Sequence, residues 1–183
     1  MLDFSRIRTY PIKQRRNLVT RANFTPVDND ADLWVNPKVL DLVARVKRAR
    51  EMDRPVIMQM GAHVVKNGLS LLVIDLMRRG IVTHVAGNGA VSIHDFEMAL
   101  IGETSEDVGE SITDGSFGMA EETGGMMNDA INANPAMGYG AVVGQMILDK
   151  RLKHREYSIL AQGRRLSVPV TIHVAIRSEE HTS

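Results

Sequence analysis

The sequence contains no cysteine, and only 4% of its residues are aromatic. The absence of cysteine excludes disulfides and thiolate metal sites, and it is typical of proteins in a reducing compartment. Acidic and basic residues balance at 22 each, so the net charge is zero. A chain without net charge has no global attraction to nucleic acid or to an anionic membrane surface. We therefore expect neither of these partners.

Long apolar runs are also missing. No stretch approaches the length that a bilayer-spanning helix requires. The first residues, Met1 to Tyr10, carry Asp3, Arg6 and Arg8 where a signal peptide would have its apolar core. The sequence therefore predicts a cytoplasmic protein of one domain, without a membrane anchor.

The two ends of the chain differ in composition from the middle. Residues 1–35 hold a basic cluster without interleaved aromatic residues, which we interpret as a solvated N-terminal arm, although it could also bind polyanions. Residues 177–183 break abruptly from an apolar run and read like a translated sequencing adapter, the alternative being a natural polar tail. We expect the domain proper to occupy residues 36–176 and to be incomplete at its C-terminus.

Periodicity predicts an alternation of helices and strands. Asn36-Pro37 is a strong helix start, and Ser92 with Asp95 three residues later has the form of a capping box. Helices are expected at residues 36–53, 63–79, 92–101, 119–131, 138–152 and 157–163, and strands at 55–60, 81–86 and 168–176. Strands separated by helices indicate an α/β fold, a Rossmann-like parallel sheet with crossover helices.

Two glycine turns follow the first two strands, Gly61-Ala62-His63 and Gly87-Asn88-Gly89-Ala90. Ligands of such sheets bind at the carboxyl ends of the strands, where glycine lets the backbone approach a phosphate and a helix N-terminus offers unpaired amides. The second turn is not a full Gly-x-Gly-x-x-Gly motif, because residue 92 is serine. The glycines could also serve only to make tight turns.

Polar residues near these turns are candidates for chemistry. His94 or Asp95 could contact a substrate or carry a proton. The two are adjacent, so on a helix they point about 100° apart, and no His-x-x-x-His pair exists; we therefore expect no metal site. Lys66 could reach an anionic ligand or simply extend from a helix face, and His84 is expected to be a packed, hydrogen-bonded histidine.

Three motifs in order resemble the deoxyhypusine synthase family and its bacterial relatives: Gln59 to Gly68, Val85 to Asp95, and Tyr157 to Ala161 with Val168 to Ile176. The resemblance implies a homotetramer that binds NAD at the strand ends and transfers an aminoalkyl group from a polyamine or related cationic amine. The cofactor-binding residues that it implies are Gly61, His63, Asn67, Gly87, Asn88, Gly89 and Ala90.

The chain departs from this family at several positions. Ile93 and His94 stand where the family has two carboxylates, and Ala62 and His63 stand where it has serine and asparagine. The family's nucleophilic lysine lies beyond the point where this chain ends, so no catalytic residue is assigned. The resemblance thus predicts an inactive fragment of an NAD-dependent transferase, or alternatively a nucleotide-binding module of the same fold without polyamine transferase activity.

Overall fold

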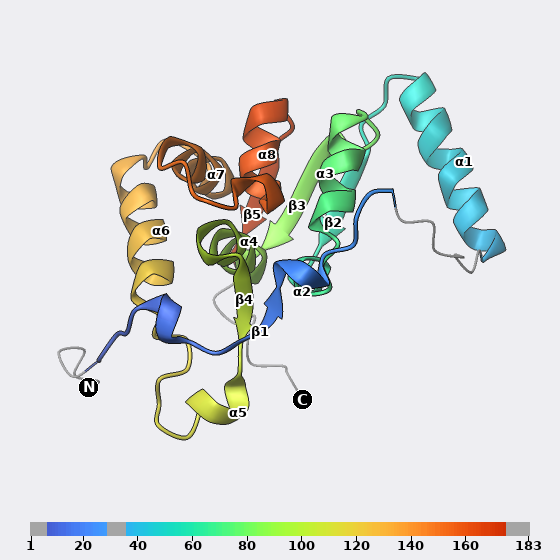
Figure 1. Ribbon diagram of the computed structural model, residues 1–183. Helices are drawn as coiled ribbons and strands as arrows, with labels where there is room; N and C mark the ends of the chain where they lie inside the picture. The colour runs from blue at the N-terminus through green and yellow to red at the C-terminus, as the bar shows by residue number, and fades with distance from the viewer. Residues whose placement is uncertain (1–6, 29–35, 175–183) are drawn as a thin grey trace.

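The computed structural model describes residues 7–28 and 36–174, apart from the side chain of Glu110, as a mixed α/β arrangement (Figure 1). The strands are β1 (Asn17–Thr20), β2 (Ile57–Met60), β3 (His84–Asn88), β4 (Glu103–Glu106) and β5 (Val170–His173). The helices are α1 (Pro37–Glu51), α2 (His63–Lys66), α3 (Ser70–Arg78), α4 (Gly89–Ile101), α5 (Val108–Ser111), α6 (Glu121–Ala133), α7 (Tyr139–Asp149) and α8 (Ile159–Leu166).

Strands β2, β3 and β5 form a parallel sheet in that order. In the register of the sheet, Met60 lies opposite Gly87 and Asn88 lies opposite His173. The carboxyl ends of all three strands therefore meet at one edge. This confirms the predicted parallel sheet with helices between its strands.

The two faces of this sheet have different surroundings. Side chains of one face enter the main core with residues of α3, α4, α7 and α8; they are Met58, Met60, Val85, Val170 and Ile172. The strands are added in one direction along the sheet, and crossovers of one hand then place their helices on the same face. The side chains of the opposite face, which include Gln59 and His173, are exposed or half-buried.

Helix α1 begins as its sequence predicts, with Asn36 capping the amide of Lys38 and Pro37 at the first position. It buries no residue, and Figure 1 shows it standing away from the other helices. Arg50 connects it to the domain by donating to the carbonyl of Gly80 at 2.9 Å. The helix is thus specified by local signals rather than by packing.

The N-terminal segment is more than a solvated arm. Strand β1 pairs antiparallel with β4, Ile12 is 1% exposed, and the side chain of Arg15 is buried. The prediction of a solvated arm is therefore wrong for Arg15, whose side chain is buried. The other basic side chains of the described segment are exposed, as predicted; they are Arg8, Lys13, Arg16 and Arg21. The division of the chain at residue 35 stays a prediction, and the expected tail at 177–183 lies outside the described residues.

The helix expected at residues 63–79 is broken into α2 and α3. Gly68 between them has a φ of +74°, and a Cβ at this position would collide with the backbone of Asn23 and Phe24. This close approach by the N-terminal segment requires glycine and ends α2. Periodicity could not reveal the break, because it arises from a contact between distant parts of the chain.

Helix α4 begins at Gly89, three residues before the expected start. Asn88 is the N-cap, and its Oδ1 accepts from the amide of Val91 at 3.2 Å. Ser92 lies inside the helix and donates to the carbonyl of Gly89 at 2.7 Å. The predicted capping box of Ser92 with Asp95 is therefore wrong, because an earlier asparagine caps the helix.

Within the described ranges, no helix has the length and apolar character that crossing a bilayer requires.

Candidate functional site

A shallow hollow of about 530 Å³ lies at the carboxyl edge of the parallel sheet. Its lining comes from the ends of all three strands and comprises Gln59, Met60, Gly61, Ala86, Gly87, Asn88 and His173. The two glycine turns lie side by side here, because Met60 and Gly87 are partners in the sheet. The sequence predicted this juxtaposition.

The glycines at this edge have different roles. A Cβ at Gly61 would meet nothing within 4 Å, and one at Gly89 would lie an ordinary 3.9 Å from Val174. A Cβ at Gly87 would lie 3.1 Å from Val91 and press against helix α4. Gly87 is thus needed for packing α4 on β3, whereas Gly61 and Gly89 keep the edge open.

The N-terminus of α4 faces the same edge. The side chain of Asn88 accepts from the amide of Val91, and the amide of Gly89 belongs to the ladder with His173, so Ala90 has the first amide of the helix without such a partner. Unpaired amides and the positive end of the helix dipole favour an anionic group. The arrangement can therefore hold a phosphate against bare main chain.

Four cofactor residues implied by the resemblance do not line the hollow: His63, Asn67, Gly89 and Ala90. His63 begins α2 and Asn67 follows its last residue, and both are exposed and outside the lining of the hollow. Sequence reasoning also missed Gln59, Ala86 and His173. Alternation along the strands was the available signal, since Gln59 and Ala86 are partners on the open face of the sheet.

A short polar chain crosses this open face. The Oγ1 of Thr171 lies 2.9 Å from the Nε2 of His84 and 2.9 Å from the Nε2 of His173. His84 is thus a hydrogen-bonded histidine, as predicted. The chain also holds the ring of His173 at the margin of the hollow.

Asp95 is sealed in the core and caps helix α8. Its carboxylate accepts from the hydroxyl of Ser158 at 2.5 Å and from the amides of Ile159 at 2.6 Å and Leu160 at 3.2 Å. Burial raises the pKa of Asp95 to about 6, although these hydrogen bonds oppose the shift. The residue is fully buried, so its expected contact with a ligand at the strand ends is wrong.

His94 lies beside a buried polar group that we call the Arg15 cluster. Arg15 donates to both oxygens of Glu97, at 2.9 and 2.7 Å, and lies 3.9 Å from Glu106. Tyr10 donates to Glu106, and two threonine hydroxyls donate to Glu97. One of these threonines, Thr104, also contacts the Nδ1 of His94. The full cluster consists of Tyr10, Arg15, His94, Glu97, Thr104, Glu106 and Thr123.

Burial and charge act together in the Arg15 cluster. Burial lowers the pKa of Arg15, but the hydrogen bond and the charge of Glu97 outweigh it, so the net shift is upward. Burial and the hydrogen bond to Glu106 raise the pKa of Tyr10 to about 12. A cluster so fully paired joins the N-terminal segment to α4, β4 and α6, and its carboxylates are committed to protein partners.

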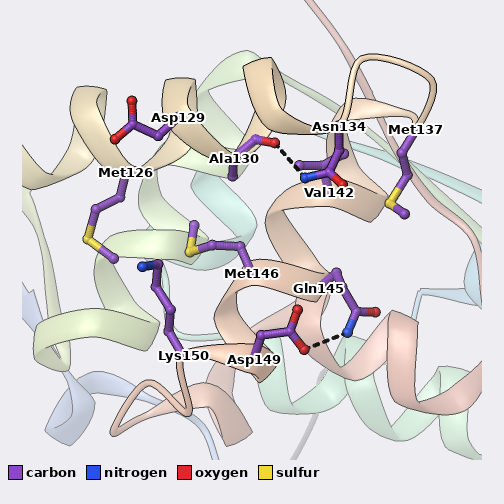
Figure 2. Close-up of a pocket in the computed structure, with 10 residues that line it drawn as sticks. All are labelled: Met126, Asp129, Ala130, Asn134, Met137, Val142, Gln145, Met146, Asp149 and Lys150. Carbon is purple, nitrogen blue, oxygen red and sulfur yellow. Dashed lines mark hydrogen bonds between the residues drawn. The ribbon is translucent and has the colours of Figure 1, made fainter.

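A second hollow, of about 450 Å³, lies between α6 and α7 (Figure 2). Three methionines, Met126, Met137 and Met146, share its lining with polar residues. Asn134 donates to the carbonyl of Ala130, while Gln145 donates to Asp149 and accepts from Arg164 of α8, so both amides are engaged with protein partners. Lys150 and the carboxylates of Asp129 and Asp149 share the lining, but no hydrogen bond or ion pair joins Lys150 to either carboxylate, and we assign the hollow no chemistry.

Comparisons with known proteins relate the fold to solved structures only. No family model and no curated protein matches the chain. The arginine dihydrolase ArgZ from cyanobacteria is 17% identical, with a TM-score of 0.51 over 79% of this chain. AgrE, in a complex of its C264A mutant with L-arginine, is 18% identical, with a TM-score of 0.52 over 80% of this chain. A protein of Methanococcus maripaludis S2 named provisionally as LOR/SDH is 16% identical, with a TM-score of 0.51 over 85%.

These likenesses correct the family resemblance. The similar structures are arginine dihydrolases and an LOR/SDH protein rather than deoxyhypusine synthases, so the predicted membership, the polyamine transferase activity and the tetramer lose their basis. Short glycine motifs misled the prediction because many parallel-sheet proteins need glycine at strand ends. The chain spans 19% of ArgZ, 21% of AgrE and 46% of the LOR/SDH protein.

Proposed function

We propose that residues 55–174 form a Rossmann-like domain that binds NAD at the carboxyl edge of β2, β3 and β5. The observation that carries the proposal is the pair of glycine turns at one edge, where Gly61 has no atom within 4 Å of an added Cβ. A dinucleotide needs this close approach of backbone to phosphate. The order of the three strands corresponds to one βαβαβ half of a doubly wound fold.

The residues at the edge divide the binding task. The amide of Ala90 and the positive end of the α4 dipole would take the pyrophosphate, and Gly61 leaves space beside them. The side-chain amide of Gln59 can donate to ribose hydroxyls, and Met60 offers an apolar contact. NAD, when bound, would supply a hydride acceptor. The residues of the edge would hold the cofactor in position.

Isothermal titration of the chain with NAD tests the proposal. We expect binding that weakens at least about tenfold in Gly61→Val, because a branched side chain then fills the space of the phosphate. Gly124→Val is the matched control, since a Cβ at Gly124 in α6 also meets nothing within 4 Å. Its affinity should equal that of the unchanged protein.

Circular dichroism of both variants separates lost binding from lost folding. L-arginine, the ligand in the AgrE complex, serves as the comparison ligand. Binding of L-arginine without binding of NAD, or equal affinities of Gly61→Val and Gly124→Val for NAD, contradicts the proposal.

A further inference from the structure

The hydrogen bonds around His94 determine which of its ring nitrogens carries a proton. Arg15 donates to both oxygens of Glu97, and Thr123 donates to the first of them, so Glu97 acts as a pure acceptor. The hydroxyl of Thr104 then donates its single proton to Glu97 at 2.7 Å. Its oxygen can only accept from His94, whose Nδ1 lies 2.8 Å away. Nδ1 therefore carries the proton.

The second ring nitrogen of His94 remains open. Within the described part of the chain, Nε2 makes no hydrogen bond, and it is not among the buried polar atoms without a partner. Solvent therefore reaches it. This distinguishes His94 from His84 and His173, whose Nε2 atoms are both occupied by Thr171.

His94 lies close behind the candidate nucleotide site. It follows Ala90 by four residues, so both lie on one face of α4, and it is about 7.5 Å along the helix axis from Gly89. The positive charge of Lys66, at the end of α2, acts on its ring. Helix α2 begins directly after the Gly61 turn. The ring thus stands between the two helices that start at the open edge.

We infer that His94 is a neutral imidazole whose Nε2 accepts a proton or a hydrogen bond from a hydroxyl group of a small molecule bound beside the nucleotide. Thr104 and Glu97 are positioning residues that hold its tautomer. The location of that ligand rests on the proposed function, whereas the tautomer does not. Such an acceptor, in reach of a nucleotide site, is the group that a reaction releasing a proton requires.

The surroundings of His94 keep it neutral. Burial lowers its pKa first, and the positive charges of Lys66, Arg15 and His63 lower it further, against the opposing charge of Glu97. Protonation would add a further cation beside Lys66 and Arg15, and it would turn Nε2 from an acceptor into a donor. The neutral form is therefore maintained around neutral pH.

Long-range ¹⁵N NMR of the histidine rings tests the tautomer directly. The His94 signal, assigned by its loss in His94→Gln, should show a protonated Nδ1 and an unprotonated Nε2. Thr104→Val should shift it toward the Nε2–H form that free histidine favours, while Thr104→Ser should retain the original pattern. A protonated Nε2 in the unchanged protein overturns the inference even if a variant fails to fold.

Carbethoxylation with diethyl pyrocarbonate, which modifies unprotonated imidazole nitrogens, tests the location. His94 should react faster than His84, and saturating NAD should protect it. Binding of NAD in calorimetry without protection of His94 overturns the placement beside the nucleotide. Absence of NAD binding contradicts the proposed function alone, and the NMR result then decides the tautomer.

Discussion

Two buried carboxylates lie two residues apart on helix α4 and are stabilised in opposite ways. Asp95 and Glu97 point about 200° apart around the helix. Asp95 accepts hydrogen bonds from one hydroxyl and two main-chain amides of the α8 start, with no cation among these partners. Glu97 accepts the fork of Arg15 and two threonine hydroxyls.

The difference shows what each carboxylate holds together. Asp95 attaches α8 to α4 with amides that a helix terminus must satisfy in any case. Glu97 attaches the N-terminal segment to α4 through its ion pair with Arg15, which lies 82 residues earlier in the sequence. Both side chains of this pair are buried. Asp95 thus joins two helices that pack against each other, whereas the Arg15 cluster joins the N-terminal segment to a distant part of the chain.

The largest expected effect comes from breaking the Arg15–Glu97 pair. Arg15→Met leaves the carboxylate buried without its cation, and we expect a loss of about 3–5 kcal/mol in the free energy of unfolding. The double variant with Glu97→Gln should lose less than the sum of the single losses. Urea denaturation of the four proteins measures the coupling.

Arg45→Met is the control for this cycle. Arg45 pairs with Asp41 at 2.9 Å on the exposed surface of α1, and such pairs contribute at most about 0.5 kcal/mol. Equal losses for Arg15→Met and Arg45→Met would show that the Arg15 cluster does not fasten the N-terminal segment.

Removing the α8 cap should have the next largest effect. Asp95→Ala leaves the hydroxyl of Ser158 and two amides buried without acceptors, and we expect a loss of roughly 3 kcal/mol at pH 5. Ser158→Ala removes one donor to Asp95 together with the N-cap acceptor of the Ala161 amide, and it should cost about 1–2 kcal/mol. Urea denaturation at this pH compares them, and a loss for Asp95→Ala no greater than for Ser158→Ala would contradict the assigned role.

The pH dependence of the cap should be smaller and has a definite sign. The pKa of Asp95 in the folded protein, about 6, lies above the usual 3.8 of an aspartate, so the folded state binds the proton more tightly. Stability from this group is fully present below about pH 4 and is lost as the pH rises through 6, by on the order of 3 kcal/mol. The difference in stability between the unchanged protein and Asp95→Ala should narrow over this range. A difference that widens with rising pH would exclude desolvation as the dominant cause.

The fold was predictable where local signals agreed with packing. Asn36-Pro37 predicted the start of α1, and the glycines at 61 and 87 predicted strand ends that meet at one edge. Prediction failed at Gly68, because the approach of Asn23 breaks the helix there. It failed again at Ser92, whose capping pattern is equally compatible with a residue inside a helix.

The candidate site was predictable only in part. The glycine turns were identified from their spacing, but Asp95 and His94 were indistinguishable as neighbours in sequence. Which of them is sealed and which is reachable depends on where α8 and β4 pack against α4. The wrong family followed from glycine motifs that many parallel-sheet folds share.

By itself the sequence determined the parallel strands, the helices between them and the open glycine edge, because hydrophobic periodicity and glycine act over a few residues. Only the tertiary structure decided the environments of the charged groups. Arg15, Glu97, Asp95 and Ser158 find their partners across long stretches of chain, and the energy of a buried charge depends on what surrounds it in space.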